Sequence, residues 1–240
     1  MNFLRTYHNL FYILLIIWGG LISCNTENYP EGDDKYSYVT SDLGTITTDE
    51  ECKMRTFITD SNSSLTLKKP IKTDWATTPD STYRVLVRYE ANTEEIKPFS
   101  IEPVFTIPFS TKLPQKEFDF DNPIHWESLW LSANAEYINM GITLMVGTDN
   151  GKEIGSQRLR VRYTKSSMFH KNGKTHMHHH LRLHHDQCDV PQYYSQSTFV
   201  SIPTHDITSA GSTAYFSSGD SITITAFTYQ GLASRSVIMK

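Results

Sequence analysis

A dense cluster of histidines has the clearest capacity for chemistry in this sequence. Six of the ten histidines of the chain lie between residues 176 and 185. Successive side chains of a strand point to opposite faces, so His176, His178 and His180 would share one face. Histidines two positions apart on a strand lie about 7 Å from one another, close enough to share a Zn²⁺ or Cu²⁺ ion. These three residues are therefore a candidate metal site.

The same cluster also fits a polar strip on the outer face of a strand. Arg182 continues the face of the three histidines, and its positive charge disfavours a bound cation there. The opposite face carries His179 with Met177, Leu181 and Leu183, as a largely apolar inner face would. A solvated histidine strip would gain positive charge below about pH 6.5. We favour the polar strip, keep metal binding as the alternative, and expect no other cofactor.

No assembled catalytic set is evident. The chain lacks a Gly-x-Ser-x-Gly elbow, a His-Glu-x-x-His helix, a Walker-type phosphate loop and a Cys-x-x-Cys pair. We therefore predict a non-catalytic binding module and keep a hydrolase with a site between two domains as an alternative. Trp75, Trp126 and Trp130 are expected to be core residues, at least two of them in the second domain, with a sugar platform as the alternative.

The N-terminus predicts secretion and lipid attachment. Arg5 precedes the apolar run 10–18, which fits a signal-peptide core and is shorter than the ~20 residues of a spanning helix. Leu21, Ser23 and Cys24 match the lipoprotein-processing pattern of an aliphatic residue, a small residue and a cysteine directly after the cut. We therefore predict a signal peptide over residues 1–23 and lipidation, including a fatty acyl group such as palmitate, at Cys24. An ordinary secretory signal or an uncleaved anchor is the alternative.

The predicted anchor places the chain in the bacterial cell envelope, and we expect the outer membrane, with the face left open. Several acyl chains anchor stably because each buried methylene contributes about 0.8 kcal/mol. Residues 24–35 comprise the lipidated cysteine and a polar, acidic segment broken by Pro and Gly, which predicts a flexible tether.

Charge and cysteine content narrow the choice of partners. The formal net charge is −4, and removal of Arg5, the only charged residue before Cys24, leaves −5. Nucleic-acid binding needs a basic footprint, so we exclude it and expect the membrane and an unidentified protein or glycan as partners. Cys52 and Cys188 remain in an oxidising compartment, where a disulfide between them and two separate thiols are both open.

From residue 36 onward the apolar pattern has a period of two, which is typical of β-strands. Tyr83–Tyr89 is the clearest strand of the first half, and prolines restrict Val104–Phe109 to a sheet edge. A passage rich in charge and proline over residues 112–123 indicates a domain boundary. We predict an all-β fold with a small barrel over residues 36–115 and an antiparallel β-sandwich over residues 116–240.

Several short motifs occur in a fixed order along the whole chain: Cys24 with its acidic spacer, 38–44, 128–132, 181–187, 200–203, and the closing strand 221–229 with Gly231. In this order they resemble NigD-like lipoproteins, a family common in anaerobic gut-type Gram-negative bacteria. The resemblance implies an N-terminal OB-like barrel, a C-terminal β-sandwich and no established catalytic residue. Because the family's name comes from a bacteriocin gene cluster, self-protection against a secreted toxin is a further alternative. The resemblance does not imply the histidine cluster.

Overall fold

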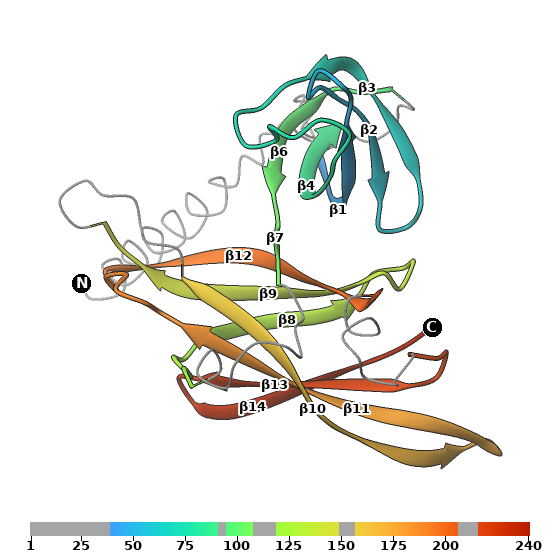
Figure 1. Cartoon of the computed structure of the whole chain (residues 1–240), viewed down its shortest axis with the longest axis vertical. Helices are drawn as coiled ribbons and strands as arrows, with labels where there is room; N and C mark the ends of the chain where they lie inside the picture. The colour runs from blue at the N-terminus through green and yellow to red at the C-terminus, as the bar shows by residue number, and fades with distance from the viewer. Residues whose placement is uncertain (1–38, 91–94, 108–118, 149–156, 206–215) are drawn as a thin grey trace, which may run out of the picture. The chain divides into compact units, whose positions relative to one another are not determined.

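The computed structural model describes residues 39–90, 95–107, 119–148, 157–205 and 216–240 (Figure 1). These residues form fourteen strands in three sheets, which confirms the predicted all-β class. Residues Thr40–Lys240 belong to one compact unit. The predicted signal peptide, Cys24 and the tether lie outside the described residues. Within the described ranges, no helix is long and apolar enough to cross a membrane.

The two edge strands of the first sheet follow one another directly in the sequence. The strands are β1 (Val39–Thr48), β2 (Met54–Thr59), β3 (Ser64–Ile71), β4 (Thr82–Glu90), β5 (Glu95–Ile96) and β6 (Pro98–Pro103), in the order β5-β3-β2-β1-β4-β6. β5 runs parallel to β3, and β6 runs antiparallel to β4. Because Lys97 alone separates β5 from β6, the sheet curls into a partly open barrel, as expected for an OB-like fold.

The barrel core follows the two-residue period of its strands. On β4, Val85, Val87 and Tyr89 point inward and join the buried cluster that also contains Ile46 and Phe57. The alternate residues of β4 point away from this core, and they carry the candidate site described below.

The remaining eight strands form two sheets that enclose a second core. One sheet has the order β7-β12-β9-β8, from β7 (Phe105–Thr106), β8 (His125–Leu131), β9 (Tyr137–Val146) and β12 (Tyr194–Pro203). The other has the order β10-β11-β13-β14, from β10 (Arg158–Lys171), β11 (Lys174–Asp186), β13 (Ser221–Thr228) and β14 (Gly231–Ile238). The two sheets lie as two layers (Figure 1). Inward side chains of both sheets, such as Met140 of β9 and Leu181 of β11, form one buried cluster, as in a β-sandwich.

The structure differs from the sequence prediction in strand direction and extent. The sandwich is not wholly antiparallel, because β11 pairs parallel to β13 and β7 pairs parallel to β12. Of the described residues in the strand predicted over 104–109, only Phe105 and Thr106 form a strand, β7, which lies at a sheet edge as predicted. β7 already belongs to the second sheet, so the chain leaves the barrel after Pro103. The predicted boundary between residues 115 and 116 lies outside the described residues.

Candidate functional site

The histidine-rich strand β11 has the two faces that the sequence predicts. His179, Leu181 and Leu183 are buried, whereas His176, His178 and His180 are half-buried on the opposite face. β11 lies between β10 and β13, so the outer histidines have neighbours on both sides.

The three histidines of the candidate metal site do not converge. The rings of His178 and His180 stack with their centroids 4.2 Å apart, and His178 Nε2 lies 2.6 Å from the hydroxyl of Thr223. His176 instead lies against Phe169, with 5.6 Å between ring centroids. The described part of the chain contains no group of three or more His, Cys, Asp or Glu residues arranged to hold a metal ion. The described residues therefore provide no complete set of ligands for the hypothesised Zn²⁺ or Cu²⁺ ion.

His179, on the inner face of β11, is a core residue with polar partners. Its Nδ1 lies 2.9 Å from the hydroxyl of Tyr163, and its Nε2 lies 3.4 Å from a carboxylate oxygen of Asp220. The ring of Phe216 packs edge-on against the imidazole. Burial lowers the pKa of His179 below its usual value, although Asp220 opposes the shift. The buried imidazole is therefore neutral near pH 7 and stabilises the sandwich core.

The two cysteines occupy turns in different parts of the fold. The Cys52 thiol donates a hydrogen bond to the carbonyl oxygen of Thr77 at 3.2 Å. Cys188 follows β11, and its sulfur lies 3.8 Å from the carbonyl oxygen of Asp186. Both cysteines are thiols in this structure. A disulfide between them stays a prediction.

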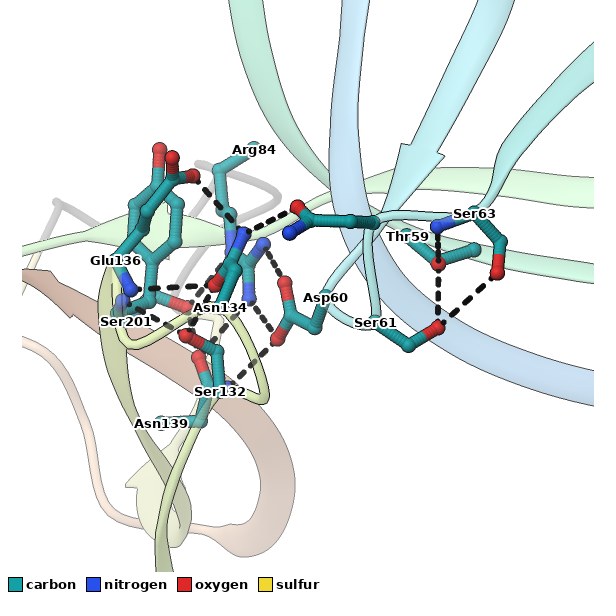
Figure 2. A network of polar contacts seen from close by, with 12 residues as sticks. Thr59, Asp60, Ser61, Ser63, Arg84, Ser132, Asn134, Glu136, Asn139 and Ser201 are labelled. Atoms are coloured by element: carbon teal, nitrogen blue, oxygen red, sulfur yellow. Dashed lines mark hydrogen bonds and ion pairs between the residues drawn. The ribbon is translucent and has the colours of Figure 1, made fainter. Parts of the chain in front are cut away.

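The outward face of β4 is covered by other strands at the position of a buried arginine, Arg84. Arg84 and Leu86 point away from the barrel core, yet both are buried. Side chains of β9 and β12, from the second sheet, provide the cover: the guanidinium of Arg84 donates to Ser201 at 3.1 Å and to Asn139 at 3.0 Å (Figure 2).

The turn between β2 and β3 completes this network through Asp60. Arg84 makes two parallel hydrogen bonds to the Asp60 carboxylate, of 2.5 and 2.7 Å (Figure 2). Such a planar, two-pronged pairing fixes orientation as well as distance. The Tyr137 ring lies 4.1 Å from the guanidinium carbon, which adds a cation–π contact. The network holds the wall of an adjacent cleft in place.

This cleft, which we call the Phe199 cleft, consists of two cavities that share Leu86 and Phe199. Their volumes are about 450 and 320 Å³, within the range of small-molecule sites when taken together. A small apolar cluster of Leu43, Leu86 and Val104 packs against Trp130 at its floor. Trp130 and Phe199 meet edge to face, with 5.8 Å between ring centroids. Phe199 is 38% exposed, so part of an aromatic surface faces the cleft.

The rim of the larger cavity is polar and rich in hydrogen-bond acceptors. Glu127 accepts hydrogen bonds from the hydroxyls of Thr143 and Ser197, and these bonds hold its pKa below the usual value. Glu102 pairs with Arg88 across neighbouring strands. An ionised, hydrogen-bonded carboxylate such as Glu127 is poorly suited to act as a general acid. The rim can instead accept hydrogen bonds from a bound molecule.

The tryptophans only partly match their expected positions. Trp126 is buried in the sandwich core, but Trp75 packs against the barrel core and Trp130 lines the Phe199 cleft. The prediction that at least two of them lie buried in the sandwich is wrong. Sequence reasoning did not identify Phe199 or Leu86. Each occupies a regular strand position, and its role follows from contacts with distant strands.

Comparison with known proteins shows the fold. No family model matches the chain, and no curated protein sequence is significantly similar to it. A NigD-like immunity protein from Bacteroides caccae ATCC 43185 matches with a TM-score of 0.55 and 21% identity, over 84% of this chain and 93% of the other. A Bacteroides fragilis NCTC 9343 protein proposed to be a lipoprotein matches with a TM-score of 0.55 and 11% identity, over 84% and 97%.

A Parabacteroides distasonis ATCC 8503 protein proposed to be toxin-related is also similar, with a TM-score of 0.54 and 15% identity over 83% of this chain and 92% of the other. The resemblance to NigD-like lipoproteins indicated by the sequence motifs is therefore confirmed as a shared fold.

Proposed function

We propose that this chain is a lipid-anchored, non-catalytic binding protein of the bacterial envelope whose ligand occupies the Phe199 cleft. The observation that carries the proposal is the composition of the cleft. It combines a partly exposed aromatic pair with a rim of carboxylate, amide and hydroxyl groups. Ligand sites in proteins typically join apolar surface to a few placed polar groups in this way.

A polyhydroxylated ligand, such as a glycan, fits these groups. The Phe199 ring offers apolar contact to the C–H face of a sugar ring, and the carboxylates of Glu102 and Glu127 accept hydrogen bonds from hydroxyl groups. Gln196 on the same rim supplies both an amide donor and an acceptor. Since the rim carboxylates already have partners, they are held in position before a ligand arrives.

Several features support a binding role over catalysis. Glu127 lies beside Ser197, but it accepts the serine hydrogen bond with a lowered pKa, so it is a weak base for activating that hydroxyl. Glu102 is paired with a cation in the same cavity. The pKa of Glu127 is lowered, whereas a general acid near neutral pH requires a raised pKa.

Binding is tested with the mature lipoprotein in detergent on an array of glucose, mannose, galactose and N-acetylglucosamine oligosaccharides. We expect binding to at least one oligosaccharide and a loss of about tenfold or more in Phe199→Ala. Tyr194→Ala is the matched control, because Tyr194 is an exposed aromatic residue on the same strand outside the cleft. No binding to any glycan, or equal losses in the two variants, would overturn the assignment of the cleft.

The anchor is tested separately in cells of a Gram-negative host. The wild-type chain should incorporate labelled palmitate and sediment with membranes, whereas Cys24→Ser should do neither. Sucrose-gradient separation of inner and outer membranes then locates the anchored protein. Membrane sedimentation of Cys24→Ser without label would show that the N-terminal segment is an uncleaved anchor.

Self-protection against a secreted toxin is the second candidate function. It is favoured by one observation, the similarity of fold to a protein described as a NigD-like immunity protein. Deletion of the gene should then increase sensitivity to a bacteriocin produced by a neighbouring strain. Unchanged sensitivity over a panel of such strains would exclude this candidate and leave the glycan proposal unaffected.

A further inference from the structure

A separate cavity lies in the wall of the barrel, where β3 departs from the closing segment. The parallel pairing of β3 with β5 ends at Leu67↔Ile96. On the other side of β3, Thr66 pairs with Thr56 but Ile71 pairs with Met54, so the intervening residues of β3 bulge away from a regular ladder. A cavity of about 400 Å³ occupies this region. It shares no lining residue with the Phe199 cleft.

The apolar part of this cavity reaches the barrel core. Ile96 is fully buried and belongs to the core cluster, and Ile71 packs against the same cluster. Pro98, the first residue of β6, extends the apolar wall. A ligand in the cavity would therefore contact side chains of the packed core, where burial of apolar surface is favourable.

Three lysines surround this apolar floor. Lys68 and Lys69 come from β3, and Lys97 lies between β5 and β6. Within the described ranges, no ion pair joins any of the three ammonium groups to a carboxylate. Elsewhere on the barrel, Lys53, Arg55 and other cations do have carboxylate partners. Three cations without such partners around one cavity favour an anionic ligand.

We propose that the barrel cavity binds an amphiphilic anion with an apolar body and a terminal carboxylate or phosphate. A neutral apolar molecule would fill the floor formed by Ile71 and Ile96 but would gain nothing from the ammonium groups. A small inorganic anion would meet the lysines but leave the floor in contact with water. An amphiphilic anion satisfies both, because lysine stems pack along apolar surface while their charged ends reach the anionic group.

Calorimetric titration of the mature chain, residues 24–240 carrying Cys24→Ala, tests the proposal. This substitution removes the chain's own acyl groups and lies outside the compact unit Thr40–Lys240. Sodium dodecanoate below its micelle concentration is the probe, compared with 1-dodecanol and inorganic phosphate. We expect dodecanoate to bind at least about tenfold more tightly than either comparison compound.

The lysines and the apolar floor are tested by two variants. Lys68→Gln/Lys69→Gln/Lys97→Gln should weaken dodecanoate binding about tenfold. Ile71→Trp should weaken it by filling the cavity, and its unchanged thermal midpoint would show that the barrel remains folded.

A matched control removes three lysines from the distant β10–β11 hairpin, at Lys165, Lys171 and Lys174. This variant makes the same change in net charge, so it should bind dodecanoate as the parent chain does. Equal weakening in the two triple variants would show a general charge effect and overturn the site.

A final arm separates a soluble ligand from a membrane surface. The parent chain is sedimented with phosphatidylcholine vesicles with and without phosphatidylglycerol. The proposal expects no lysine-dependent recruitment to the anionic vesicles. Such recruitment without dodecanoate binding would replace the small-ligand site by a membrane contact. Equal affinity for phosphate and dodecanoate would likewise overturn the amphiphilic character of the ligand.

Discussion

Replacement of Arg84 by methionine removes the central cation of the network in Figure 2 while keeping most of the length of the side chain. The arginine side chain is only 3% exposed, and its loss leaves the carboxylate of Asp60 without its two-pronged partner. Asn139 and Ser201 lose a donor at the same time, inside the contact between strands. Removing one partner of a buried ion pair typically costs about 3–5 kcal/mol, since the other charge remains buried without compensation.

For a chain of this size, each kcal/mol shifts the midpoint of thermal unfolding by about 2–4 °C, so Arg84→Met should melt roughly 6–20 °C lower. Urea unfolding followed by circular dichroism measures the free energy directly. Arg88→Met is the matched control, because Arg88 lies on the same face of β4 but is 40% exposed and pairs with the exposed Glu102. Exposed pairs contribute about 1 kcal/mol or less.

If the free energies of unfolding of Arg84→Met and Arg88→Met differed by less than about 1 kcal/mol, the reasoning would be refuted. The network would then contribute no more to stability than an exposed ion pair. The double variant Arg84→Met/Asp60→Leu provides a second check. It removes both charges, so it should recover much of the stability lost in the single variant. A double variant as unstable as Arg84→Met would show that packing, rather than the unpaired carboxylate, causes the loss.

Three further predictions concern other parts of the fold. Gly44→Ala should destabilise the barrel by about 1–3 kcal/mol in urea unfolding, because a Cβ there would lie 2.5 Å from the Phe57 ring. The pKa of His179 is lowered in the folded chain, so folding favours the neutral imidazole. The free energy of unfolding should therefore fall as the pH drops below about 6.5, where the unfolded chain takes up a proton that the folded chain resists. His179→Gln should flatten this dependence between pH 7.5 and 5, and equal slopes would contradict it. Thr143→Val should raise the pKa of Glu127 toward its usual value in a carboxyl NMR titration, because the Thr143 hydroxyl is the main cause of its lowering.

The two-residue period of the apolar pattern predicts which face of a strand a residue lies on. It does not predict which other strands pack against that face. It correctly separates the two faces of β11. It also assigns Arg84 and Leu86 to the outside of the barrel, where solvent would be expected. Their burial depends on side chains such as Ser201, 117 positions away in the sequence. Both the network and the Phe199 cleft therefore depend on contacts that no local pattern contains.

The strands β5, β6 and β14 are not predicted from the sequence, because their apolar alternation is weak. The closing segment of the barrel, β5 and β6, is interrupted by Lys97 and contains Pro98 and Pro103, residues that normally count against a strand. β14 begins with Gly231, which has a φ of 103°, and most of its side chains are polar or exposed. The sequence pattern does not predict that β11 and β7 have parallel partners, because strand order is determined by packing of the whole sheet.

The histidine strip shows why spacing along one strand does not define a metal site. A strand brings alternate residues to one face, and His178 and His180 are indeed adjacent. A closed site needs further ligands from neighbouring strands. In register with His180, β10 presents Lys165 and β13 presents Thr223, a cation and a hydroxyl. Partial burial, with His178 and Lys165 nearby, lowers the pKa of His180, so the surroundings of this ring disfavour additional positive charge. The pairing of the sheet, rather than the histidine spacing, therefore determines which groups lie beside His180.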